Sequence, residues 1–231
     1  MTGMLVVIGL VGFGTLFYWL LVATEGTYLG SRVFTLLYDV TASGYDKIKD
    51  LNYVAEARCV GLPLAEALGG VQSPRVLDVA AGTGRVPIAL LRSGERGSSI
   101  VAVDRSARML GEARAALSDC DGTVALVQGD AGALSFGDNT FDCVTCLEAL
   151  EFMPRPRETV REMVRVLKSR GVLLLSNRVG VDAWFFPGRL CGRGRLEGHL
   201  GELGLERIET QRWQVHYDLI WARKPSASDP P

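Results

Sequence analysis

The sequence has almost no net charge. Its 231 residues include 25 Lys and Arg against 26 Asp and Glu, for a formal net charge of −1, and the pI is about 6.2. A protein that binds nucleic acid by itself usually presents a basic field, so this composition argues against a DNA or RNA partner. Basic residues do gather at Arg189, Arg193 and Arg195. That group is either an exposed, solvated loop or a contact for lipid phosphates.

Cysteines are few, odd in number and scattered, at positions 59, 120, 143, 146 and 191. Cys143 and Cys146 have the spacing of a pair of metal ligands, but they lie on a predicted strand, where a separation of three residues puts side chains on opposite faces. Neither a second cysteine pair nor a nearby His completes a zinc site. We therefore predict buried thiols in a reducing compartment and no bound metal.

Charge is also missing from the N-terminus. Residues 4–23 contain no charged side chain, and no Lys or Arg precedes Arg32. The apolar run is long enough to cross a bilayer, and its aromatic residues 17–19 suit a membrane interface. A cleaved signal peptide would begin with basic residues and have a shorter apolar region; a buried core helix is the other alternative. We predict that residues 1–30 form an uncleaved single-pass membrane anchor, with Arg32, Lys47 and Lys49 favouring a cytoplasmic location for the rest.

The stretch 76–84, Val-Leu-Asp-Val-Ala-Ala-Gly-Thr-Gly, has the pattern of a ligand-binding loop. A short apolar strand ends in an acid and continues into a loop of small residues, and a helix is predicted from Arg85. Gly82 and Gly84 let the backbone approach a ligand closely, and the helix N-terminus offers free N–H groups. Such loops hold nucleotide-like cofactors at the carboxyl end of the first strand of a doubly wound sheet.

The residues around this loop argue against a dinucleotide. The NAD fingerprint needs a third glycine at the position where Pro87 stands. Asp78 would lie close to the place of a diphosphate, so its carboxylate favours a cationic or zwitterionic ligand. An NAD-dependent oxidoreductase is therefore the less favoured alternative.

Three further elements follow in order over about a hundred residues. A strand at 99–103 ends in Asp104, twenty residues after Gly84, the spacing of an acid that binds ribose hydroxyls. A strand at 124–128 runs into Gly129-Asp130-Ala131, and a strand at 141–146 follows the turn 137–140. Together with the loop, these elements resemble the class I S-adenosylmethionine-dependent methyltransferases, most closely the quinone- and lipid-type branch. Ala80 departs from the pattern, since it stands where the family has a first glycine.

The resemblance implies an α/β fold, a doubly wound Rossmann-like sheet of seven strands whose last strand is antiparallel and lies between the fifth and sixth. It implies S-adenosyl-L-methionine as the cofactor, with Asp104 on the ribose and the turn 129–131 at the adenine. The simpler explanations are helix caps for Asp78 and Asp104 and an ordinary turn for Asp130. The implied cofactor-binding residues are Asp78, Ala80, Gly82, Gly84, Asp104, Arg105, Met109, Asp130, Ala131 and Leu147.

Local patterns predict the remaining organisation. Residues 31–74 form a helical lead-in, 75–224 the methyltransferase domain, and 225–231 a disordered tail. After Pro154 and Pro156, a stripe at 160, 163, 164 and 167 predicts a helix that continues through Lys168 and Arg170 and ends at Gly171. Strands are expected at 172–176, 206–214 and 216–223, with a helix near 196–203.

Two segments are candidates for the neighbourhood of the acceptor. Tyr38-Asp39 and Tyr45-Asp46 resemble the lead-in that covers the cofactor in quinone-type methyltransferases; the alternative is a helix that packs its aromatic residues on the sheet edge. The segment 179–187 contains three adjacent aromatic residues. These residues suit either an apolar acceptor or the core.

The cofactor's sulfonium carries an activated methyl group, so the protein mainly aligns the reactants. An oxygen or carbon acceptor also needs a base. The candidates are Glu148, Glu151, Asp182, His199 and His216, and the sequence does not choose among them. We thus predict a membrane-anchored methyltransferase for a small or lipophilic acceptor, such as a quinone precursor or a phospholipid amine. A non-catalytic nucleotide-binding protein of the same fold is the main alternative, and the oligomeric state is left open.

Overall fold

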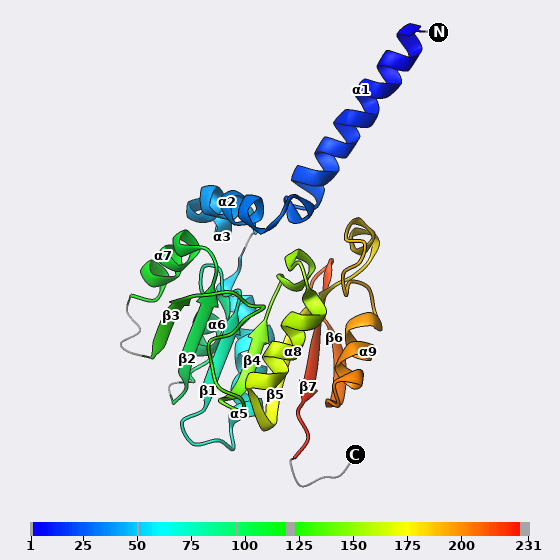
Figure 1. Ribbon diagram of the computed structural model, residues 1–231. Helices are drawn as coiled ribbons and strands as arrows, with labels where there is room; N and C mark the ends of the chain where they lie inside the picture. The colour runs from blue at the N-terminus through cyan, green and yellow to red at the C-terminus, as the bar shows by residue number, and fades with distance from the viewer. Residues whose placement is uncertain (1, 50, 96, 119–122, 227–231) are drawn as a thin grey trace.

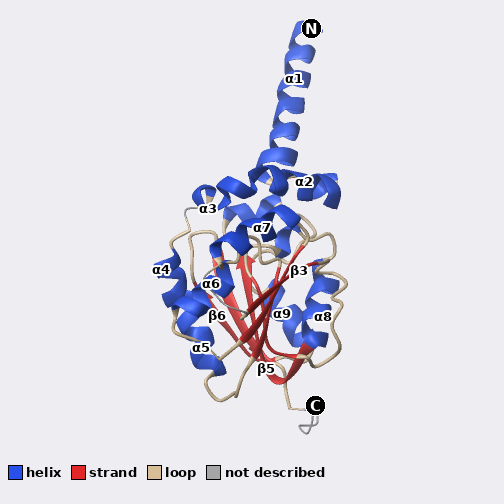
Figure 2. Ribbon diagram, turned by 90° about the vertical axis from the view of Figure 1, so that its left-hand side faces the viewer, coloured by secondary structure: helices blue, strands red, loops and turns tan. Residues whose placement is uncertain are grey.

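A computed structural model describes residues 2–49, 51–95, 97–118 and 123–226. It shows an α/β domain from which one long N-terminal helix projects (Figures 1 and 2). The strands are β1 (Arg75–Val79), β2 (Ser99–Asp104), β3 (Val124–Gln128), β4 (Phe141–Cys146), β5 (Leu167–Arg178), β6 (Glu206–Arg212) and β7 (Tyr217–Arg223). The α-helices are α1 (Thr2–Tyr18), α2 (Ser31–Thr41), α3 (Tyr45–Ile48), α4 (Tyr53–Glu56), α5 (Leu62–Leu68), α6 (Arg85–Arg92), α7 (Ala107–Ala116), α8 (Pro156–Val166) and α9 (Arg195–Glu202). Short 3-10 or π turns, labelled η1 to η6, lie at Trp19–Ala23, Thr27–Leu29, Ala42–Gly44, Ala57–Gly61, Leu150–Phe152 and Val181–Phe185.

The seven strands form one sheet in the order β3-β2-β1-β4-β5-β7-β6. The first five pair in parallel, and β7 is antiparallel to both of its neighbours, β5 and β6. This confirms the predicted doubly wound sheet with its last strand antiparallel between the fifth and sixth. The strand order reverses between β1 and β4, and in open α/β sheets ligands bind beyond the carboxyl ends of the strands at such a reversal.

Helices cover both faces of the sheet (Figure 2). Strand side chains alternate between the faces, so Leu77 packs with α8 and α9 while its neighbour Val76 packs with η4, α5 and α6. Cys143 and Cys146 lie in the two different clusters and are both buried, as their spacing predicts. Cys120 lies outside the described residues.

The boundary between α8 and β5 differs from the prediction. The helix ends at Val166, and Leu167 already pairs with Phe141 of β4. Lys168 lies in β5, and its Nζ lies 2.9 Å from a carboxylate oxygen of Asp142 on β4. Gly171 therefore sits inside a strand rather than after a helix. Strand pairing and this ion pair outweigh the local helix signals.

The N-terminal helix stands apart from the domain. Residues Gly3–Ala23 are apolar and long enough to cross a membrane, and none of this segment is buried. Within this chain the segment is therefore not packed as a core helix, and a signal sequence passes the same test of length and composition. Helices α2, α3, α4 and α5 lie within the predicted lead-in, and α2 lies across the end of the domain from which α1 projects (Figure 1). Residues 227–231 of the predicted tail lie outside the described part of the chain.

Candidate functional site

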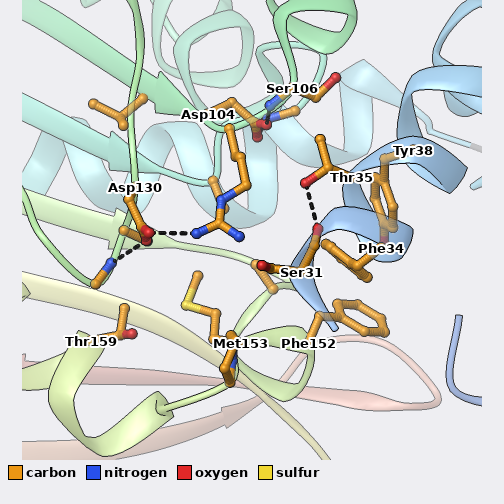
Figure 3. Close-up of a pocket in the computed structure, with 18 of the residues that line it drawn as sticks. Ser31, Phe34, Thr35, Tyr38, Asp104, Ser106, Asp130, Phe152, Met153 and Thr159 are labelled. Carbon is orange, nitrogen blue, oxygen red and sulfur yellow. Dashed lines mark hydrogen bonds and ion pairs between the residues drawn. The ribbon is translucent and has the colours of Figure 1, made fainter. Parts of the chain in front are cut away.

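A cavity of about 380 Å³ lies at the carboxyl ends of the strands, where the strand order reverses. Its volume is in the range of about 300–1,000 Å³ that is usual for small-molecule sites. Figure 3 shows Asp104 and Asp130 on the sheet side and the side chains of α2 opposite them. Seven of the ten predicted cofactor-binding residues line this cavity: Ala80, Gly82, Asp104, Arg105, Asp130, Ala131 and Leu147.

Asp104 joins two of the loops that form the cavity. One carboxylate oxygen accepts the backbone N–H of Gly82 and the other that of Ser106, both at 2.8 Å. The cap of α7 is Ser106, whose hydroxyl accepts the N–H of Met109 at 3.0 Å. A carboxylate has about four lone-pair sites, so Asp104 can accept a further hydrogen bond in the cavity that it lines without breaking these two. Burial raises the pKa of Asp104, against the lowering effect of the backbone N–H groups.

Asp130 organises the neighbouring wall. One oxygen accepts the N–H of Gly132 at 2.9 Å, which closes the turn after β3, and the other pairs with Arg105. Partial burial opposes ionisation, but the Gly132 N–H and the Arg105 guanidinium together lower the pKa of Asp130. Its carboxylate thus remains charged at the rim of the cavity.

The loop after β1 takes the left-handed conformation that its glycines predict. Gly82 has φ +54 and Gly84 has φ +89. Ala80 has φ +56, a conformation that favours glycine, so the departure from the family pattern carries backbone strain. An added Cβ on Gly84 would lie 3.2 Å from Leu117 Cδ1, so this glycine also lets α7 approach the loop.

Three predicted cofactor-binding residues do not line the cavity. Gly84 shapes the loop, and the side chain of Met109 is buried beneath α7. Asp78 is buried behind the loop, where it accepts the hydroxyl of Thr145 at 2.7 Å. Burial raises the pKa of Asp78 to about 7. These three residues lie next to the cavity wall without lining the cavity.

Of the proposed catalytic bases, only Glu148 lines the cavity. Its carboxylate lies 2.6 Å from Arg85 Nη1 and 3.7 Å from Lys49 Nζ. Arg85 also holds the carboxylate of Glu56 through two hydrogen bonds, at 2.8 and 3.0 Å. Glu148 is therefore buried beside two cations in the wall of the cavity.

The other candidate bases lie elsewhere. Glu151 is buried, 3.0 Å from Arg178 Nε, and accepts the hydroxyl of Tyr217. His199 is buried under α9 against Arg157, and the ring of His216 pairs with Asp182 at 2.7 Å. None of these four lines the cavity. The structure thus separates candidates that the sequence left equal.

The segment before the sheet forms the roof of the cavity. The rings of Tyr38 and Tyr45 line it, together with Phe34 of α2. The acids that follow the two tyrosines accept hydroxyl groups from two loops that follow strands of the sheet and from α4. Asp39 accepts the hydroxyl of Ser106, and Asp46 accepts those of Thr83 and Tyr53, both at 2.6 Å.

Other cavity residues carried no local signal in the sequence. They are ordinary polar or apolar side chains that the fold brings together, and their position in the chain matches no motif. They include Thr27, Ser31, Thr35, Met153, Arg155 and Thr159.

Comparison with known proteins agrees with this geometry. A family of sequences described as a methyltransferase domain matches residues 77–175. The demethylmenaquinone methyltransferase of Renibacterium salmoninarum is 36% identical over 142 residues, which are 61% of this chain and 56% of that protein. The ubiquinone/menaquinone biosynthesis C-methyltransferase UbiE of Pseudomonas paraeruginosa is 42% identical over 111 residues, 47% of this chain and 43% of its own length. The chain spans about half the length of these relatives.

Solved structures share the fold. The [4+2]-cyclase SpnF superposes with a TM-score of 0.63 at 22% identity, covering 74% of this chain and 81% of that chain. The solved structure shows the fold, and the family match shows that residues 77–175 are similar to a methyltransferase domain. The chain is also similar to quinone-type C-methyltransferases, and this similarity implies S-adenosyl-L-methionine as the cofactor.

Proposed function

We propose that this chain methylates a lipophilic acceptor at a membrane that residues 4–23 span, with the domain on the cytoplasmic side. The observation that carries the proposal is the roof of the cavity. It is made by α2, which follows the apolar helix in the chain with only η1, η2 and a short turn between them. A quinone precursor is the favoured acceptor, in agreement with the relatives, and a phospholipid amine is the second candidate.

The cavity fits the cofactor in shape and charge. Open space surrounds the missing side chain of Gly82, so the loop backbone is accessible to a ligand. Asp104 would hold the ribose hydroxyls through its remaining lone pairs, and the turn around Asp130 would hold the adenine. The acids of the cavity suit a cationic ligand. The bound cofactor supplies an activated methyl group on a sulfonium.

The apolar part of the cavity suits the acceptor. The rings of Phe34 and Phe152 lie 5.4 Å apart, one on the roof and one on η5, and Met153 follows on the same wall. Such a wall excludes water and aligns an apolar ring, and alignment is the main contribution that a protein makes to this displacement. The hydrogen bonds of Asp39 and Asp46 hold the roof over the cofactor loops.

Glu148 is the proposed base. It would accept the proton that the acceptor loses as the new bond to the methyl group forms. Arg85 and Lys49 fix the position of its carboxylate in the cavity. We expect Glu148→Gln to lower turnover by about 10²- to 10⁴-fold, the usual contribution of a positioned base, while the Kd for the cofactor changes little.

Glu56→Gln is the matched control, because Glu56 is also buried and also binds Arg85 but does not line the cavity. An equal loss of turnover in both variants would assign the effect to Arg85 and would exclude Glu148 as the base.

The activity itself is tested with the full chain in membranes, cofactor labelled in its methyl group and a total lipid extract as the source of acceptor. Label in a lipid product one methyl group heavier supports the proposal. Cofactor binding without any transfer would support the non-catalytic alternative. Protection from thermal unfolding by NAD, with none by S-adenosylhomocysteine, would support the oxidoreductase.

A further inference from the structure

Four arginines gather around a surface hollow of about 480 Å³ beside the cofactor cavity. Two of them, Arg189 and Arg195, come from the basic group noted in the sequence. The third member of that group, Arg193, is instead paired with Asp218 at 2.6 Å. The N-terminus of α8 supplies the other two, Arg155 and Arg157. The hollow is thus assembled from segments that lie far apart in the chain.

The positive charge of this hollow is not balanced. Glu158 pairs with Arg155 at 2.9 Å and Glu202 pairs with Arg157 at 3.1 Å. Among the described residues, Arg189 and Arg195 have no carboxylate within ion-pair distance. Four guanidinium groups against two carboxylates leave two positive charges. The hollow therefore has the charge of an anion site.

The guanidinium group of Arg189 is fixed by one hydrogen bond but has a second donor without a partner. Its Nη1 donates to the carbonyl oxygen of Pro154 at 2.5 Å. Its Nε is buried and has no hydrogen-bond partner within the described chain. The first turn of α8, which borders the same hollow, adds backbone N–H groups that favour an anion.

Aromatic contacts place this hollow at the base of the apolar helix. The guanidinium of Arg189 lies 5.3 Å from the centre of the Tyr28 ring. Tyr28 stacks at 5.1 Å on Trp19, and its hydroxyl donates to the carbonyl oxygen of Pro187 at 2.8 Å. Trp19 begins the last turn of the apolar segment, where aromatic side chains of spanning helices meet the headgroups. The arginine hollow therefore lies next to the expected level of the headgroups.

The segment η6, which precedes Arg189 in the chain, also favours contact with a membrane. It follows β5 and presents Trp184, which is 86% exposed, and Val181, which is 78% exposed. An exposed Trp beside basic residues suits an interface where one side is apolar and the other carries phosphates.

We propose that the arginine hollow binds the phosphate of an anionic phospholipid headgroup and so docks the domain on the membrane. This inference rests on the proposed membrane location of residues 4–23. Arg155 lines both the hollow and the cofactor cavity. A docked headgroup therefore sets the distance and tilt at which the acceptor side of the cavity meets the bilayer.

The test uses the full chain in a neutral detergent and three soluble probes: dihexanoyl phosphatidylglycerol, dihexanoyl phosphatidylcholine and inorganic phosphate. Calorimetry should show saturable binding of the phosphatidylglycerol and weaker binding of the other two. Arg189→Gln and Arg195→Gln should each weaken it about fivefold, the usual contribution of one basic residue near anionic lipid. Two variants are used so that a folding defect in one, visible in its thermal midpoint, does not decide the result.

Arg161→Gln is the matched control, since Arg161 is exposed on α8 and does not line the hollow. An equal loss in this variant, or phosphatidylcholine binding as tight as that of phosphatidylglycerol, would overturn the proposal. Inorganic phosphate binding as tightly as the lipid would assign the hollow to a free anion instead. Methyl transfer measured on the same preparations distinguishes failure of this inference from failure of the proposed function.

Discussion

The substitution Asp104→Asn keeps the size of the side chain and replaces one carboxylate oxygen by an amino group. In the structure, each oxygen accepts one backbone N–H, from Gly82 and from Ser106, at 2.8 Å. The variant can accept only one of them. Both backbone bonds exist with and without the cofactor, so the change in affinity comes from the proposed hydrogen bond of a ribose hydroxyl to the Asp104 carboxylate. A hydrogen bond to a charged group contributes about 1.5–3 kcal/mol, and about 1.4 kcal/mol corresponds to a tenfold change in affinity. We therefore expect the Kd for S-adenosylmethionine to rise between about tenfold and 150-fold.

Isothermal titration of the full chain with S-adenosylmethionine measures this change. Asp142→Asn is the matched control, because Asp142 also accepts a backbone N–H, from Arg75 at 2.9 Å, but lies at the start of β4, away from the cavity. A Kd for Asp104→Asn within about threefold of wild type, or an equal loss in Asp142→Asn, would refute the assignment of Asp104 to the cofactor.

Three further substitutions test the fold around the site. Asp78→Asn should remove part of the pH dependence of the free energy of unfolding. Burial raises the pKa of Asp78 from 3.8 to about 7, so the protonated side chain contributes its full stabilisation below pH 3.8, and this is lost as the pH rises towards 7. Urea midpoints that vary with pH in the same way for wild type and variant would contradict this. Ala80→Gly should raise the free energy of unfolding by up to about 1 kcal/mol, because relief of the left-handed strain exceeds the entropy cost of glycine; a lower thermal midpoint would argue against strain. Gly61→Ala would place a Cβ 2.1 Å from the carbonyl oxygen of Ala89 and should cost about 1–3 kcal/mol or more, whereas the control Gly70→Ala has open space and should change the denaturation midpoint little.

The architecture could be predicted because its signals are local. Each parallel strand is a short apolar run that ends in a loop of small or acidic residues, and these loops must share one edge of a parallel sheet. This is why Asp104 and Asp130 could be assigned to one site although 26 positions separate them. The boundary between α8 and β5 could not be predicted in the same way. It depends on the pairing of Leu167 with Phe141, a contact between distant segments.

The part of the cavity around Tyr38, Tyr45 and Glu148 shows the same division between local and long-range signals. Tyr38, Asp39, Tyr45 and Asp46 were recognisable as paired motifs, but their partners on the cofactor loops were not. Glu148 and Glu151 stand three residues apart, and the chain alone did not separate them. The fold turns Glu148 into the cavity and ties Glu151 to Arg178 and Tyr217.

The sequence by itself thus determined the sheet, the cofactor loops and the apolar N-terminal segment, because hydrophobic periodicity and backbone conformation are properties of neighbouring residues. Only the tertiary structure decided which acid lies in the cavity, and only it assembled the arginine hollow from α8 and the loop after η6. Contacts between distant segments depend on how the layers pack, and no local pattern records them.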